Sequence, residues 1–205
     1  MVYTDLHYFG ALSYYSAIIE TDLLVFDTQV AFSKMSFKNR MVIASAQGPL
    51  HLTIPIIGGR HQKTPMDQIR ISYESQWQSQ HFKSIYTNYK RAPFFDYYVD
   101  SIKTLYSLKC EFLNDFLLET QKWTNQHLKA KWVIKTVEST KLEENQTKWI
   151  DPIKPNNFQS ENRIVQYQQV FEEVTGYIPN LSILDLIFAM GGRQASSMIS
   201  PIEMK

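Results

Sequence analysis

The chain has 205 residues, which suits one large domain or two small ones and is long enough to bury a substantial core. Hydrophobic residues make up 44% and charged residues 20%, with only 7 glycines and 8 prolines, so a disordered or collagen-like chain is excluded. The formal net charge of +1 gives no overall field that would attract nucleic acid or an anionic membrane.

The first elements predicted along the chain are a strand, a helix and a second strand. The strand covers residues 2–6, the helix follows a short turn and covers residues 11–19, and the second strand covers residues 23–26. The second strand is an unbroken apolar run, which is typical of a parallel sheet covered on both faces. This order predicts a βαβ unit.

A hairpin and a helical region are predicted next. Residues 41–44 and 50–54 have strand patterns, and the Gly-Pro pair between them suits a hairpin turn. From residue 77 the apolar residues recur with helical spacing, which predicts three helices that end near residue 128. Residues 132–137 have a strand pattern and are expected to return to the sheet.

The last part of the chain predicts a loop and two helices. Residues 138–162 are polar and contain two prolines, so we expect a surface loop that could act as a lid. A helical pattern follows, and Gly176 occupies the usual C-terminal capping position. The final helix begins at Ser182, a good N-cap residue from which Asp185 could complete a capping box, and it ends at Gly191.

No repeat or change in composition divides the chain. We therefore predict one α/β domain over residues 1–192, with an N-terminal βαβ unit, an antiparallel hairpin extension and a helix-rich C-terminal half. Residues 193–205 are polar and are expected to form a mobile tail.

The single cysteine and the N-terminus bear on location. Cys110 excludes an intrachain disulfide and a cysteine-based zinc site, and we interpret it as a small buried residue. The first residues lack the features of a signal peptide, and no window approaches the roughly 18 apolar residues that span a bilayer. We expect a cytoplasmic protein without membrane insertion.

The charge is distributed unevenly along the chain. Residues 1–33 carry a net charge of −4, whereas residues 34–70 carry +5. The basic segment offers cationic, hydroxyl and amide donors that suit a phosphate or carboxylate. A solvated loop, or charges that protect a sheet edge, would give the same pattern. The candidate anion-binding residues are Lys34, Ser36, Asn39 and Arg40, with Lys63 in a second basic loop.

Three side chains are candidates for proton transfer. His7 follows the first strand and Asp27 ends the second, the edge at which open α/β sheets bind ligands. His81 lies one helical turn after Trp77, and both could line a pocket. Each has a structural alternative. His7 would be a turn histidine, Asp27 a turn carboxylate, and His81 part of ordinary helix packing. No pair of histidines has metal-ligand spacing, so we predict no metal site, and the sequence identifies no cofactor.

Aromatic residues make up 14% of the chain, which would suit a core, a sugar platform or a base-stacking surface. Most of them fall at core-facing helical positions. The remaining candidates for ligand contact are Tyr8, Phe9, Phe37 and Trp77. Single-stranded nucleic-acid binding is disfavoured, because the net charge is near zero.

An ordered set of motifs spans nearly the whole chain and resembles the WbqC-like family of bacterial proteins. The matches are residues 22–27, 29–34, 36–37, 39–40 and 52–56, Trp77, His81, residues 89–90 and 92–95, Tyr98, Tyr167, and residues 169–171, 176–188 and 191–192. Typical members open with His-Gln-Pro-x-Tyr-Phe-Pro. Here Thr4, Asp5 and Leu6 replace the first three residues, and Gly10 replaces the second proline.

The resemblance implies a role in surface-polysaccharide (O-antigen) synthesis, because family members belong to such gene clusters and are described as transferases, including a glycine transferase. We therefore expect a transferase whose partner is a small anionic substrate, either a sugar nucleotide or an activated amino acid. The basic segment would hold the anion, and His7, Asp27 or His81 would carry protons. The alternative is a non-catalytic binding or scaffold protein. The sequence leaves the oligomeric state open.

Overall fold

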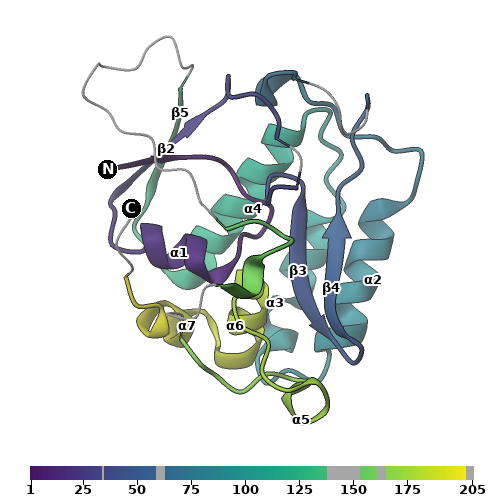
Figure 1. The fold of residues 1–205 in the computed structure, drawn as a ribbon, viewed down its shortest axis with the longest axis vertical. Coiled ribbons are helices and arrows are strands. Elements are labelled where there is room, and N and C mark those ends of the chain that lie inside the picture. The colour runs from purple at the N-terminus through teal and green to yellow at the C-terminus, as the bar shows by residue number, and fades with distance from the viewer. Residues whose placement is uncertain (34, 59–62, 138–152, 161–164, 202–205) are drawn as a thin grey trace.

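The computed structural model describes residues 1–33, 35–58, 63–137, 153–160 and 165–201. Its main sheet is parallel and has the strand order β1 (Val2–Thr4), β2 (Leu23–Asp27), β5 (Val133–Val137). Tyr3 pairs with Val25, which in turn pairs with Lys135. Helix α1 (Leu12–Ile18) connects β1 to β2, so the predicted βαβ unit is confirmed (Figure 1).

The central strand of this sheet is the most buried. Four of the five β2 residues are buried, as the unbroken apolar run predicted, whereas most of β5 is exposed. Helix α4 (Leu113–Leu128) packs near α1, since the Tyr15 hydroxyl donates to Gln121 Oε1 at 3.4 Å. Because β1 and β2 pair in parallel, their carboxyl ends lie at one edge of the sheet, where Asp5 follows Thr4 and Asp27 follows Phe26, the last pair in the register.

The predicted hairpin forms a separate two-stranded antiparallel sheet. Strands β3 (Arg40–Ser45) and β4 (Gly48–Thr53) pair from Arg40–Thr53 to Ser45–Gly48. Gly48 has a φ of 100°, a conformation that the tight turn requires and that glycine adopts without strain. Helix α2 (Trp77–Tyr89) packs on the hairpin, where the Tyr89 hydroxyl accepts a hydrogen bond from the Ala44 N–H at 2.9 Å (Figure 1).

The remaining elements complete the helical half. Helix α3 (Phe95–Leu105) follows α2, and α4 is capped at its C-terminus by Lys129, whose φ of 56° is left-handed. Two short 3-10 helices are η2 (Met66–Gln68) and η4 (Phe158–Ser160). Aromatic residues supply the bulkiest side chains of the core: the largest fully buried side chains described are all aromatic and include Tyr8, Phe9, Phe37 and Trp77.

The C-terminal third differs from the prediction in two places. The helix expected before Gly176 is reduced to α5 (Glu172–Thr175), because the Gln169 side chain binds both backbone groups of Ile178 and so favours a loop. Ser182 caps the N-terminus of helix α6 (Ile183–Met190), as predicted.

The expected mobile tail is the second difference. Residues Gly192–Met198 form helix α7, which contacts both α4 and α6, and Ala195 and Ile199 are buried (Figure 1). Only residues 202–205 of the expected tail lie outside the described part of the chain. Most of the predicted polar loop over residues 138–162 also lies outside it, apart from residues 153–160.

Candidate functional site

Charged side chains gather at the carboxyl edge of the parallel sheet. Lys38 Nζ lies 3.0 Å from Asp5 Oδ2, and the side chains are only 3% and 11% exposed. Asp27 Oδ1 accepts a hydrogen bond from the Gln29 N–H at 2.9 Å. Burial, and then the nearby Asp27 carboxylate, raises the pKa of Tyr3 to about 12. The sequence placed Asp27 at this edge but did not identify Lys38 and Asp5 as an ion pair.

His7 lies in an aromatic pocket beside that pair. Its ring stacks on Tyr14 with 4.2 Å between the ring centroids, and Phe37 lies 5.8 Å away. Burial lowers the pKa of His7 to about 3, although Asp5 acts in the opposite direction. His7 is therefore a neutral, enclosed imidazole at pH 7.

The N-terminus of α1 lies next to the sheet edge at which His7 was expected to contact a ligand, and residues from the other end of the chain occupy it. The Leu12 N–H donates to the Leu181 carbonyl at 3.0 Å, and the Ser13 N–H donates to Asn180 Oδ1 at 2.8 Å. Ser182 Oγ donates to the Phe9 carbonyl at 2.7 Å. These bonds satisfy the donors that an anion would need.

The donors of the basic segment bond within the segment itself or to the adjacent end of the hairpin. Ser36 Oγ donates to the Ser33 carbonyl at 2.8 Å, and Asn39 Nδ2 donates to the Ile54 carbonyl at 2.9 Å. Arg40 Nε donates to Thr53 Oγ1 at 2.9 Å. Lys34 lies outside the described residues, and Lys63 is exposed.

The two basic loops do lie side by side at one point. The Phe32 N–H donates to the Thr64 carbonyl at 2.9 Å, and Ala31 pairs with Pro65. His81 contacts Tyr8, the residue after His7, and bonds to the backbone of Thr53, whose Oγ1 accepts from Arg40.

His81 belongs to a buried chain of hydrogen bonds. Tyr8 Oη lies 2.9 Å from His81 Nδ1 and also bonds to the Tyr106 hydroxyl. Burial lowers the pKa of His81 to about 4, while its bond to the Thr53 carbonyl acts in the opposite direction. A carbonyl can only accept, so the other nitrogen of the neutral ring carries the proton. Nδ1 is then the acceptor for Tyr8, and Tyr106 donates to Tyr8. Trp77 packs edge-on against His81 at 5.2 Å and lines a cavity of about 470 Å³.

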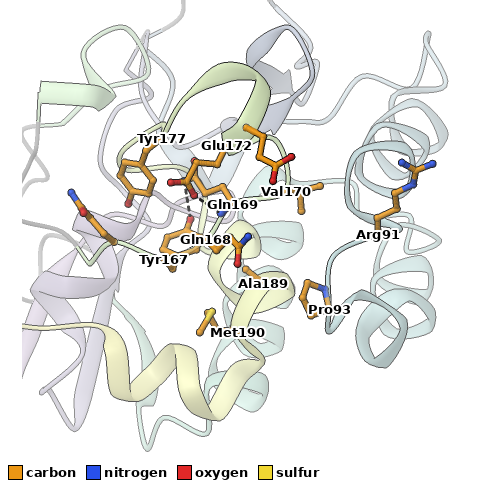
Figure 2. Close-up of a pocket in the computed structure, with 12 residues that line it drawn as sticks. Arg91, Pro93, Tyr167, Gln168, Gln169, Val170, Glu172, Tyr177, Ala189 and Met190 are labelled. Carbon is orange, nitrogen blue, oxygen red and sulfur yellow. Dashed lines mark hydrogen bonds between the residues drawn. The ribbon is translucent and has the colours of Figure 1, made fainter.

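A larger cavity, of about 880 Å³, lies between the loop before α5 and the end of α6. Figure 2 shows Tyr167, Gln169 and Glu172 grouped on one side of this cavity, with Pro93 and Arg91 on the other. The full lining is Arg91, Pro93, Gln166, Tyr167, Gln168, Gln169, Val170, Glu172, Glu173, Tyr177, Ala189 and Met190.

A buried carboxylate lies behind the wall of this cavity. Asp185 Oδ1 accepts from the Tyr167 hydroxyl at 2.8 Å, and Oδ2 accepts from the Tyr89 hydroxyl at 2.5 Å. Burial raises the pKa of Asp185 to about 6, against the opposing effect of the two tyrosines. Tyr167 both lines the cavity and touches the carboxylate, so it connects the two.

Gln169 fixes the loop that carries Tyr167. Its Nε2 donates to the Ile178 carbonyl at 2.8 Å, and its Oε1 accepts from the Ile178 N–H at 2.9 Å. The Tyr177 hydroxyl donates to the Val165 carbonyl at 2.9 Å. The loop is therefore closed on itself, and the Tyr167 ring is held in one place.

The sequence did not predict this site. Asp185 was expected to complete a capping box with Ser182, and the Ser182 half of that prediction is confirmed because its Oγ accepts from the Leu184 N–H at 3.4 Å. The Asp185 carboxylate instead binds tyrosines from two other segments. One signal was present, since Asp185 is the only charged residue in the otherwise apolar run 183–189.

Other reactive groups in the described part of the chain are less suited to chemistry. Cys110 is partly buried, and burial, with smaller effects from Asp115 and Glu119, raises the pKa of its thiol. Within the described residues no three His, Cys, Asp or Glu side chains form a metal-binding group. No helix there is long and apolar enough to cross a membrane.

The fold and these sites define a mixed α/β protein with a small parallel sheet, a β-hairpin and a helical half. The model of the WbqC-like protein family matches residues 7–157, well over half of the chain, so the protein belongs to that family. The resemblance seen in residues 167–192 lies beyond the matched region. No curated protein and no solved structure gives a significant match.

Proposed function

We propose that the protein is a cytoplasmic transferase of surface-polysaccharide synthesis, and that it acts on a sugar nucleotide or an activated amino acid such as an activated glycine. The observation that carries the proposal is the contact between Asp185 and Tyr167 at the wall of the 880 Å³ cavity. A buried carboxylate with a raised pKa beside a cavity is typical of a site for proton transfer.

The transfer step needs a base for the attacking hydroxyl or amine. As that group attacks the activated carbon or phosphorus atom, its proton passes to Tyr167 Oη, and the Tyr167 proton passes to Asp185 Oδ1. The bond to the leaving group breaks, and the leaving group departs with the electron pair as an anion. With a pKa of about 6, Asp185 is mostly ionised at pH 7 and can accept that proton.

The charged residues that line the cavity suit the acceptor substrate, which carries the attacking group, better than they suit an anionic donor substrate. Glu172 and Glu173 line one side, and Arg91 is the single cation in the lining. Two carboxylates would repel a phosphate but would attract an amine or accept hydrogen bonds from sugar hydroxyls. We therefore assign the acceptor substrate to this cavity.

The experiment compares binding and turnover in matched variants. A panel of sugar nucleotides and activated amino acids is screened by thermal stabilisation, and turnover is measured for each ligand that binds. Tyr167→Phe keeps the ring but removes the proton carrier, so we expect turnover to fall at least 100-fold with little change in stabilisation. Tyr86→Phe, at an exposed tyrosine on α2, is the control and should match the wild type.

Equal turnover in Tyr167→Phe and the wild type would contradict this site. Absence of stabilisation by every ligand would instead favour the alternative of a non-catalytic binding or scaffold protein. That alternative has an observation in its favour, because the opening turn and the basic segment are held by internal hydrogen bonds.

A second candidate site is the carboxyl edge of the sheet, and the buried Asp5–Lys38 pair favours it. There His7 and Asp27 would carry protons, and the basic segment would hold the anion. This placement predicts that His7→Gln abolishes turnover while Tyr167→Phe does not. The two variants therefore distinguish the two sites.

A further inference from the structure

A second large cavity, of about 830 Å³, adjoins the first, and Met190 lines both. The start of α3, the end of α4 and the junction between α6 and α7 form its walls. The lining residues are Phe94, Tyr97, Tyr98, His127, Lys129, Met190, Gly191, Gly192, Arg193, Gln194 and Ser197.

One wall of this cavity is aromatic. Tyr97 is 80% exposed, the highest exposure among the large hydrophobic side chains described, and its ring centroid lies 6.1 Å from that of Phe94. Tyr98 is fixed, because its hydroxyl accepts from the Gly192 N–H at 2.7 Å and its ring packs edge-on against His127 at 5.0 Å. The wall therefore combines a rigid ring with one that is free to stack on a ligand.

The charged groups that line this cavity are all basic. Lys129 and Arg193 are exposed, and no carboxylate belongs to the lining. Burial and then the Lys129 charge lower the pKa of His127, which places Lys129 close to the ring. The lining of the first cavity is instead acidic on balance, because it contains two glutamates and one arginine.

Two glycines let the walls approach each other. A Cβ atom on Gly191, whose φ is 76°, would lie 3.0 Å from the Phe94 ring. A Cβ atom on Gly192 would lie 1.9 Å from the His127 carbonyl oxygen. The cavity shape thus depends on Gly191 and Gly192, which hold α7 and its Arg193 against the end of α4.

We propose that this second cavity binds a nucleoside phosphate, with the base on the Phe94 and Tyr97 rings and the phosphate between Lys129 and Arg193. Aromatic rings stack on any base, and an arginine binds a phosphate in bidentate fashion. The role of this ligand as the activated donor rests on the proposed function, whereas its binding does not. The shared Met190 would then separate the donor from the acceptor in the first cavity.

The test is calorimetric titration of the whole protein with each of the four nucleoside 5′-monophosphates, with the matching nucleosides and with inorganic phosphate. We expect the monophosphates to bind at least tenfold more tightly than nucleosides or phosphate. Tyr97→Ala and Arg193→Gln should each weaken that binding at least tenfold, and both side chains are exposed. Lys122→Gln, at an exposed lysine on α4 outside the cavity, should bind within twofold of the wild type.

Three results would overturn the proposal: no binding of any monophosphate, equal binding of inorganic phosphate, or unchanged binding in both Tyr97→Ala and Arg193→Gln. Tyr167→Phe separates this inference from the proposed function. If that variant and the wild type bind monophosphates equally but neither shows turnover with any acceptor, the second cavity stands and the transferase proposal fails.

Discussion

Asn180 completes the N-terminus of helix α1 by binding Ser13 through both ends of its side-chain amide. Its Oδ1 accepts from the Ser13 N–H at 2.8 Å, and its Nδ2 donates to Ser13 Oγ at 3.0 Å. Nδ2 also donates to the Phe158 carbonyl at 2.9 Å. Asn180 is fully buried, and its φ of 58° is one that asparagine tolerates better than most residues.

Replacing this amide should cost much of the stability of the fold. Asn180→Ala removes three buried hydrogen bonds and leaves the Ser13 N–H unsatisfied, so we expect the free energy of unfolding to fall by about 3 kcal/mol. Urea denaturation measures this change. Asn88→Ala is the control, because Asn88 only donates to the Ser84 carbonyl within α2 and its loss should cost about 0.5 kcal/mol. Equal losses in the two variants would contradict the role of Asn180.

A methyl group at Gly192 should displace α7. The nearest atom to such a group is the His127 carbonyl oxygen at 1.9 Å, so Gly192→Ala is expected to cost about 3 kcal/mol or more. Gly176→Ala is the matched control, since Gly176 has a φ of 70° but open space around it, and strain alone should cost about 1 kcal/mol. Hydrogen exchange shows which part of the fold is disturbed. The amides of α7 should lose protection in Gly192→Ala but not in Gly176→Ala.

His81 should make the fold less stable in acid. Its pKa is about 4 in the folded protein and about 6.5 when unfolded, so the unfolded state binds more protons between these values. The contribution of His81 is therefore present above pH 6.5 and is lost as the pH falls toward 4, at up to about 1.4 kcal/mol per pH unit. His81→Gln should be less stable at pH 7 but should lose less stability between pH 7 and pH 5. Parallel profiles for variant and wild type would exclude this role.

The ionisation of Asp185 should make the fold less stable as the pH rises, the opposite of the pH dependence that His81 gives. The folded pKa of Asp185 is about 6 and lies above the ordinary aspartate value of 3.8, so the folded state binds the extra proton. This stabilising contribution is complete below pH 3.8 and is lost as the pH rises through 6. Relative to the wild type, Asp185→Asn should therefore become more stable as the pH rises from 4 to 7. Denaturant midpoints at four or five pH values test this, and a constant difference would contradict it.

Prediction from sequence succeeded where local patterns determine the structure. The apolar run of β2 is buried as its pattern requires, and the turn before Gly48 joins β3 and β4 in the expected antiparallel pair. Helix α7 was missed because its residues are mostly polar and small. Its position depends on the close contact of Gly192 with α4, which no periodicity reveals.

The candidate sites were harder to predict for a different reason. Tyr89, Tyr167 and Asp185 come from three separate segments, and only the tertiary fold brings their oxygens within hydrogen-bonding distance. The hydrogen-bond partners of the basic segment were equally hidden in the sequence. Ser36 and Asn39 looked available to a ligand, but nearby backbone carbonyls accept their hydrogen bonds.

The dependence of α1 on Asn180 also sets an order of events during synthesis. The partners Ser13 and Asn180 are 167 residues apart, and Phe9 and Ser182 are 173 apart. At the roughly 5–20 residues per second of translation, the first helix waits on the order of 10–30 s for its cap to be made. A nascent chain stalled before residue 180 therefore exposes an unfinished amino-terminal helix, and an incompletely folded segment of this kind is open to chaperones and proteases.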